Sequence, residues 1–167
     1  MMNKAILLIG GNQGDRHALL EQATEQIRQR IGSVVALSRM YETEPWGEFE
    51  VKEGNQKVEC FLNRGLKVET TLSPWQVLRT ALDIETRLGR NRRGSCDAEG
   101  CVRLYHSRPI DIDLIFYDAL VLDSPELILP HPRMHLRRFV LEPLTDIVPD
   151  YRHPVMGKTV NELLSEL

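Results

Sequence analysis

Two strand-like stretches with no helix between them place the strongest limit on the fold of this chain. Residues 34–41 and 58–68 are rich in apolar and β-branched side chains, and no helical pattern separates them. Parallel neighbouring strands need a crossover connection, which is usually a helix. The pair therefore argues against a flavodoxin-like parallel sheet.

The rest of the chain completes an alternating order of elements. A buried strand is expected at residues 4–9, and a helix capped by Asp15 and stopped by Gly32 follows it. Ser73 and the proline after it are typical of a helix start. Residues 110–117 have the pattern of a fourth strand, and a turn leads from it into a short strand at 120–122. This β-α-β-β-α-β order predicts an α/β (α+β) sandwich of the ferredoxin-like type, with a C-terminal helical extension.

Length and composition indicate one ordinary globular domain covering residues 1–167. The net charge of −3 argues against bulk nucleic-acid binding, and no stretch is long enough to be a membrane span. The three cysteines, Cys60, Cys96 and Cys101, do not form a disulfide framework. We therefore expect a cytoplasmic enzyme with neither nucleic-acid nor membrane partners.

The predicted fourth strand carries two carboxylates, Asp111 and Asp113, in an otherwise apolar run. Side chains alternate between the faces of a strand, so both aspartates should share one face, about 7 Å apart. Paired carboxylates can hold a hard cation such as Mg²⁺, and the nearby Arg108 could bind its anion. The alternative is a solvated strand face neutralised by arginines.

Two long polar segments, residues 45–57 and 90–107, connect the predicted elements. Loops of this length in a compact domain are usually functional lids or disordered segments. The second segment is rich in arginine and leads directly into the aspartate strand, which suggests polyphosphate chemistry. A solvated charged loop is the alternative for any single arginine.

Residues 130–139, PHPRMHLRRF, add imidazole, guanidinium and an aromatic ring. Several segments together closely resemble the 6-hydroxymethyl-7,8-dihydropterin pyrophosphokinase family, an enzyme family of folate biosynthesis. They are Gly10-Gly11-Asn12, Tyr41-Glu42-Thr43, Phe61-Leu62-Asn63, Gly89-Arg90, the aspartate strand with Arg108, and Pro130-His131-Pro132-Arg133-Met134. The resemblance runs in order from Ile6 to about Pro149.

The resemblance implies transfer of diphosphate from ATP, as co-substrate, to the hydroxymethyl group of the pterin, with release of AMP. It implies that two Mg²⁺ ions lie between Asp111, Asp113 and the triphosphate. Arg90 and Arg108 match arginines that contact the phosphates and assist transfer, and Arg92 matches a loop arginine involved in closure or release. The remaining matches to ATP-binding positions are Glu85, His131 and Arg137.

The pterin is a flat ring with a donor and acceptor edge, which an amide and an aromatic sandwich can bind. By resemblance, Asn63 reads that edge, while Phe61 and Phe139 form the two walls. The segment Thr43, Glu44, Pro45 and Trp46 matches the family's pocket lining. Ordinary core packing is the alternative for either phenylalanine. The resemblance also suggests that the protein associates with the next enzyme of the folate pathway.

Some features depart from the family or favour other chemistry. The segment between Arg92 and Arg108 is longer than in short members, and only Tyr105 lies near the position of the family's loop tryptophan. A zinc site at Cys96 and Cys101 lacks a clear fourth ligand. Among other function classes, a ferredoxin-like regulatory module would not explain the paired carboxylates. Another Asp-x-Asp enzyme, such as a phosphohydrolase, would not explain the pterin-binding residues.

Overall fold

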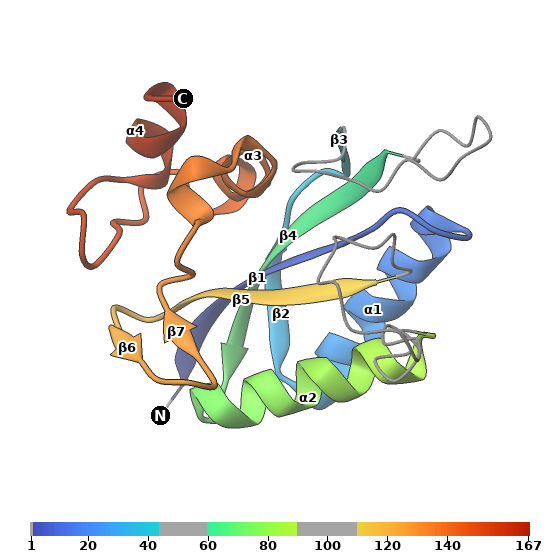
Figure 1. Cartoon of the computed structure of the whole chain (residues 1–167). Helices are drawn as coiled ribbons and strands as arrows, with labels where there is room; N and C mark the ends of the chain where they lie inside the picture. The colour runs from blue at the N-terminus through green and yellow to red at the C-terminus, as the bar shows by residue number, and fades with distance from the viewer. Residues whose placement is uncertain (1, 44–59, 90–109) are drawn as a thin grey trace, which may run out of the picture.

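The computed structural model describes residues 2–43, 60–89 and 110–167 (Figure 1). In chain order its elements are β1 (Asn3–Gly11), α1 (Arg16–Arg30), β2 (Ser33–Leu37), β3 (Tyr41–Thr43), β4 (Phe61–Thr70), α2 (Pro74–Arg87), β5 (Asp111–Tyr117), β6 (Leu122–Asp123), β7 (Ile128–Leu129), the 3₁₀ helix η1 (Met134–Leu136), α3 (Arg138–Ile147) and α4 (Val160–Ser165). None of the helices in these ranges is long and apolar enough to cross a bilayer.

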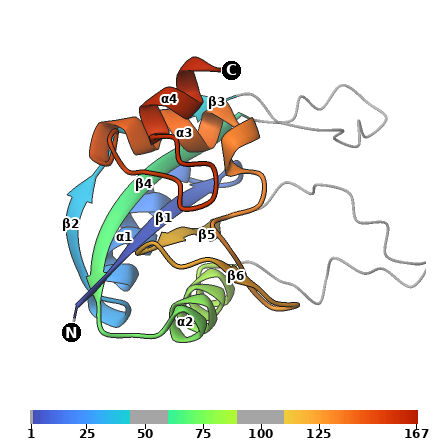
Figure 2. The same cartoon turned by 90° about the vertical axis from the view of Figure 1, so that its left-hand side faces the viewer.

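The main sheet has the strand order β2-β4-β1-β5, and each neighbouring pair is antiparallel. Strands β2 and β3 pair with the same edge of β4. Strand β3 pairs with residues 61–63 of β4, and β2 pairs with residues 66–69. Helices α1 and α2 cover one face of the sheet, and α3 and α4 lie over the other (Figures 1 and 2). The predicted ferredoxin-like β-α-β-β-α-β sandwich is therefore confirmed, with its C-terminal extension covering the second face.

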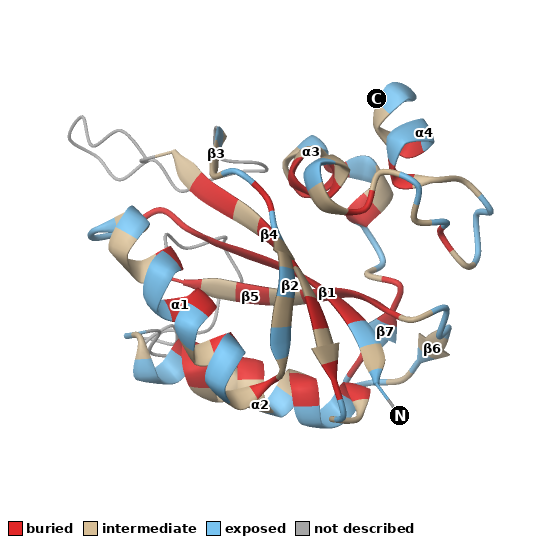
Figure 3. Ribbon diagram, turned by 180° about the vertical axis from the view of Figure 1, so that it is seen from behind, coloured by how far each residue is buried: buried red, intermediate tan, exposed pale blue. Residues whose placement is uncertain are grey.

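Apolar side chains fill the space on both sides of the sheet. On β1, Ala5, Leu7 and Ile9 pack with α1 and α2, whereas Ile6 and Leu8 pack with α3 and α4. Burial on both faces explains why β1 is a nearly continuous apolar run rather than an alternating one. Figure 3 colours most of β1 as buried.

The predicted helix starts are confirmed by their capping bonds. Asp15 accepts a hydrogen bond from the backbone N–H of Ala18 at 3.1 Å. Ser73 and Gln76 form a reciprocal capping box at the start of α2. These bonds satisfy N–H groups that have no partner inside the helix.

The prediction of one strand over residues 34–41 is wrong, because the chain leaves the sheet between β2 and β3. At the break, the backbone N–H of Ser38 still donates to the carbonyl of Gly65 at 2.9 Å, but the N–H of Gly65 donates to the buried hydroxyl of Ser38 at 2.8 Å. A side-chain oxygen thereby takes the place of a ladder partner. Strand β3 resumes at Tyr41 and pairs with the first residues of β4.

Gly32 follows α1, as predicted, but for a different reason from a left-handed helix cap. Gly89 after α2 has a φ of +107°, whereas Gly32 is not among the glycines with positive φ. A Cβ atom at Gly32 would instead lie 2.1 Å from the carbonyl oxygen of Glu69. The close approach of the β4 backbone therefore requires glycine at this position.

We expect Gly32→Ala to lower the free energy of unfolding by about 3 kcal/mol, since the added methyl group must displace backbone rather than a side chain. Gly89→Ala is the matched control, because its Cβ would meet no atom of the described residues within 4 Å. The strained φ of Gly89 should cost this variant about 1 kcal/mol. Urea unfolding of both variants measures the difference. A loss for Gly32→Ala no larger than that for Gly89→Ala would contradict the steric explanation.

Candidate functional site

The two aspartates of β5 lie on the face of the sheet that α3 and α4 cover. Ile112 and Leu114 point to the opposite face, where they join the core under α1 and α2. Asp111 and Asp113 are half-buried, and Ile115 next to them belongs to the core under α3 and α4. The predicted alternation of carboxylates and apolar side chains is confirmed.

Strand register brings residues from distant parts of the sequence into one row across the sheet. Gly10 of β1 lies opposite Asp111 of β5 on one side and opposite Asn63 of β4 on the other. Tyr41 of β3 lies opposite Asn63. Directly paired residues share a face, so Asp111, Gly10, Asn63 and Tyr41 form a line on the α3 side. We call this line the site row.

The amide of Asn63 is buried and has a fixed orientation. Its Nδ2 donates a hydrogen bond to Oγ1 of Thr43 at 2.9 Å. A Cβ atom at Gly10 would lie 2.3 Å from its Oδ1, so the amide oxygen occupies the space that only glycine leaves open. Asn63 and Thr43, predicted to bind the same ligand, are therefore in direct contact, and Gly10 makes room for them.

His131 reaches the same face from the segment after β7. Its backbone N–H donates to the carbonyl of Ile115 at 3.0 Å. Burial lowers the pKa of His131 to about 4, the positive charge of Arg137 also lowers it, and the carboxylate of Asp111 acts in the opposite direction. These three predicted site residues thus lie near enough for their charges to affect one another.

Arg137 is largely buried at the start of α3. Its guanidinium lies over the ring of Phe139, 5.5 Å from the ring centroid. Phe139 is partly buried and packs against the core under α3 and α4, and Phe61 shares a face with Asn63, two residues along β4. Both predicted ring walls thus come from elements bordering the same face.

Glu85 differs from the other described site residues because it lies on the other side of β5. It is 1% exposed, and its Oε1 accepts a hydrogen bond from the backbone N–H of Ile112 at 2.7 Å. Ile112 lies between the two aspartates, so this carboxylate from α2 holds the strand that carries them. Its proposed contact with a nucleotide stays a prediction.

The described carboxylates suit a cation that arrives with additional ligands. Asp111 and Asp113 provide the oxygen donors that Mg²⁺ prefers, and Mg²⁺ usually keeps waters and phosphate oxygens as its other ligands. Across residues 2–43, 60–89 and 110–167, no group of three or more His, Cys, Asp and Glu side chains could hold a metal ion. The pair itself supplies two carboxylate ligands that fit the oxygen chemistry of Mg²⁺.

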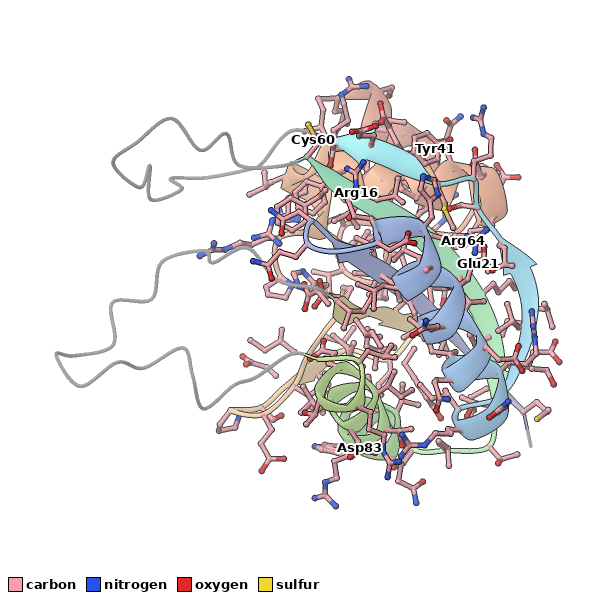
Figure 4. All side chains as sticks on the ribbon, turned by 90° about the vertical axis from the view of Figure 1, so that its right-hand side faces the viewer. Arg16, Glu21, Tyr41, Cys60, Arg64 and Asp83 are labelled. Atoms are coloured by element: carbon pink, nitrogen blue, oxygen red, sulfur yellow. The ribbon has the colours of Figure 1, made fainter. Side chains whose placement is uncertain are left out.

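Two sets of contacts at the base of the β3–β4 hairpin were not predicted from the sequence. The hydroxyl of Tyr41 donates to Oδ1 of Asp146 on α3 at 2.8 Å. On the other face, Nη1 of Arg16 donates to the carbonyl of Cys60 at 2.7 Å and to Glu42 at 3.2 Å. Figure 4 labels Arg16, Cys60 and Tyr41 at this end of the sheet. Strand alternation places Tyr41 and Thr43 on one face once the bounds of β3 are known. No sequence motif indicated Asp146.

Six predicted site residues lie outside the described residues. They are Glu44, Pro45, Trp46, Arg90, Arg92 and Arg108. Their assignments stay predictions, and Cys96 and Cys101 also lie outside the described residues.

A family pattern and similar proteins from other organisms all give this chain the same family. The pattern of the 7,8-dihydro-6-hydroxymethylpterin-pyrophosphokinase (HPPK) family matches residues 6–149. A 2-amino-4-hydroxy-6-hydroxymethyldihydropteridine pyrophosphokinase from Porphyromonas gingivalis is 42% identical over 149 residues, covering 89% of this chain and 92% of the relative. A protein of the same name from Methylorubrum extorquens is 36% identical, covering 99% of this chain and 94% of the relative.

Solved structures support the fold. A structure described as HPPK-DHPS in complex with substrates matches with a TM-score of 0.73 at 15% identity, over 99% of this chain and 43% of that chain. A Plasmodium falciparum HPPK-DHPS variant matches with a TM-score of 0.72 at 19% identity, over 99% of this chain and 44% of that chain. The chain therefore spans less than half of these longer proteins, and the similarity extends to nearly all of its own length.

In protein without added divalent metal, we expect the imidazole of His131 to titrate with a pKa of about 4. The unfolded chain binds this proton near pH 6.5, so the contribution of His131 to folding stability is complete above that pH. It declines as the pH falls from about 6.5 towards 4, because the unfolded state then binds more protons. NMR of the imidazole carbons measures the midpoint.

Arg137→Gln is the matched variant for this titration, because it removes a nearby positive charge that lowers the pKa of His131. The midpoint should rise in this variant. A wild-type midpoint of about 6 or more, close to that of a free histidine, would contradict the described environment.

Proposed function

This chain belongs to the 7,8-dihydro-6-hydroxymethylpterin-pyrophosphokinase (HPPK) family, and we propose that its reaction takes place along the site row. The chain is a diphosphotransferase of folate synthesis, which moves diphosphate from ATP to the hydroxymethyl group of hydroxymethyldihydropterin. The observation that carries the assignment of the site is the alignment of Asp111, Gly10 and Asn63 on three adjacent strands.

The spacing of the site row suits a flat substrate. Adjacent strands are about 4.8 Å apart, so the backbones at Asn63 and Asp111 are separated by about 10 Å. A pterin ring bound at one edge by the Asn63 amide, whose oxygen lies over Gly10, would extend from there towards β5. Its hydroxymethyl group would then point towards the aspartates.

We assign metal binding to Asp111 and Asp113, which would hold the two Mg²⁺ ions implied by the family resemblance. Bound Mg²⁺ neutralises phosphate charge and draws the attacking and leaving oxygens into line. The rigid strand orients both carboxylates on one face, and Glu85 supports that strand through the Ile112 N–H. The carboxylate pair and its oxygen chemistry support this assignment.

We assign the pterin edge to Asn63 and Thr43, with Phe61 and Phe139 as the two walls. The Asn63–Thr43 hydrogen bond supports this assignment, because it holds the amide in place with Nδ2 towards the Thr43 hydroxyl. An amide held in one orientation discriminates a donor–acceptor edge better than a rotating one. Glu44, Pro45 and Trp46 complete the proposed pocket lining.

We assign ATP binding to His131 and Arg137, with Glu85 near the bound nucleotide. Arg137 supplies a fixed positive charge for phosphate. His131, whose pKa is lowered to about 4, is neutral near pH 7 and can form a hydrogen bond without adding charge. Arg90 and Arg108 are proposed to assist transfer, and Arg92 to act in closure or release.

Association with the next enzyme of the folate pathway is a separate proposal. The longer structures that share this fold are described as HPPK-DHPS proteins, in which both names belong to one chain. Co-elution of the two purified enzymes in size-exclusion chromatography tests a complex. A cytoplasmic location is proposed together with this pathway role.

The metal assignment predicts that Asp111→Ala and Asp113→Ala each lower the rate of AMP formation by about 10³-fold or more. Each change removes an oxygen ligand for the ions that stabilise transition-state charge. The assay measures AMP released from MgATP with and without hydroxymethyldihydropterin. Asp123→Ala, on β6 away from the row, is the control and should keep normal activity.

Wild-type protein that forms no pterin-dependent AMP would contradict the assigned reaction. Near-normal turnover of both aspartate variants at saturating Mg²⁺ would contradict only the metal assignment.

The pterin assignment predicts that Asn63→Ala weakens pterin binding by about 1–3 kcal/mol, since polar atoms of the bound ring lose their partner. Thr43→Val should also weaken it, because the Asn63 amide loses the acceptor that orients it. Nucleotide affinity should change little in either variant. Isothermal titration with each ligand decides the point, and equal losses for ATP and pterin would count against the role.

A further inference from the structure

We propose that Asp146 is a positioning residue for the pterin-binding amide, acting through Tyr41. Asp146 lies on α3 and does not belong to the site row, whereas Tyr41 is the row's outer member. The inference rests on the proposed function of Asn63 and extends it to residues that do not touch substrate.

Strand β3 needs support from outside the sheet. It has three residues, Tyr41–Thr43, and within the described residues its only strand partner is β4. A pairing this short makes few ladder bonds and fixes register weakly. Thr43 nevertheless has to present its hydroxyl to Asn63 at hydrogen-bond distance.

Asp146 provides that support through both of its carboxylate oxygens. Oδ1 accepts the hydroxyl hydrogen bond from Tyr41 at 2.8 Å, and Oδ2 accepts the backbone N–H of Arg39 at 3.1 Å. These contacts fix the chain at two points just before and within β3. Asp146 lies in the last turn of α3, and its side chain is 20% exposed.

The charge of Asp146 is stable at neutral pH. Partial burial raises its pKa, but hydrogen bonds from Arg39 and Tyr41 outweigh burial and lower it overall. The carboxylate therefore stays ionised, and a hydrogen bond to an ionised acceptor is stronger than a neutral one. The guanidinium of Arg39 is 79% exposed, so its ion pair with Asp146 adds little.

The link from Asp146 to the amide is short. Tyr41 lies directly opposite Asn63 across the β3–β4 ladder, and Thr43 lies two residues further along on the same face. A displacement of β3 moves the Thr43 hydroxyl relative to the Asn63 amide, and hydrogen bonds weaken steeply with distance and angle. Loss of the Tyr41–Asp146 bond should therefore loosen the amide's orientation.

On the opposite face, Arg16 holds the same hairpin by binding the carbonyl of Cys60 and the side chain of Glu42. These contacts do not involve Thr43, which lies on the same face of β3 as Tyr41 and Asp146. The two faces of β3 are therefore held by different layers, one by α1 and one by α3.

The test compares Tyr41→Phe with Tyr117→Phe in the full-length chain. Tyr41→Phe deletes the exposed bond to Asp146 and the bond that the hydroxyl accepts from Nη2 of Arg39 at 2.8 Å. Tyr117→Phe deletes a part-buried bond to the carbonyl of Leu72 at 2.6 Å, at the other end of the sheet. Tyr41→Phe should raise KM for the pterin by about 5- to 10-fold, the effect of one lost hydrogen bond. KM for ATP and kcat should stay within about twofold.

Asp146 variants separate positioning from general stability. Asp146→Ala should raise the pterin KM as much as Tyr41→Phe or more, and Asp146→Asn should recover part of it, because an acceptor oxygen remains. The double variant Tyr41→Phe/Asp146→Ala should be no worse than Asp146→Ala alone. Arg39→Gln removes the exposed ion pair and the 2.8 Å hydrogen bond from Nη2 of Arg39 to the Tyr41 hydroxyl. It keeps the Tyr41–Asp146 bond and should therefore change little.

A pterin KM for Tyr41→Phe equal to that for Tyr117→Phe would overturn the inference. An equal rise in KM for ATP, or additive effects in the double variant, would also overturn it. The proposed function itself fails only if wild-type protein lacks pterin-dependent AMP formation or Asn63→Ala leaves pterin affinity unchanged, so the two failures are distinguishable.

Discussion

The antiparallel pairing of β1 with β4 and β5 is the constraint on which the rest of the site depends. It places Gly10 between Asn63 and Asp111, residues that lie far apart in the sequence. Strand spacing then fixes the separation between the amide that reads a ring and the carboxylates that hold cations. A one-residue slip on either side of β1 would move one of these groups to the opposite face.

The two layers of helices have different roles around the site row. Helices α1 and α2 form the larger core on one face, and from that side Glu85 supports the aspartate strand. Helix α3 and the segment before it supply His131, Arg137, Phe139 and Asp146 on the other face. The site therefore lies where the second helical layer meets the sheet, and the first layer keeps the sheet rigid.

Much of the fold could be predicted from local patterns. Capping residues located both long helices, and alternation in the predicted fourth strand indicated that Asp111 and Asp113 share a face. The break at Ser38 could not be predicted, because it depends on a hydroxyl bond to Gly65, distant in sequence. The contact of Asp146 with Tyr41 likewise joins residues 105 positions apart, with no motif to connect them.

The pterin-binding and metal-binding residues were identified by resemblance, and their proximity could not be obtained from spacing. Strand order and register decide which residues of adjacent strands lie side by side. Both depend on the packing of the two cores. Glu85 illustrates the difference. Its place in the sequence suggested a nucleotide contact, while its described bond goes to the backbone of β5.

That bond has a consequence for association between molecules. Strand β5 is at the edge of the described sheet, and an edge strand presents backbone groups that can template a foreign strand. The N–H of Ile112 is already occupied by a buried carboxylate from α2. A strand from another chain would have to displace Glu85 to pair there, so the edge that carries the aspartates is protected against β-type aggregation.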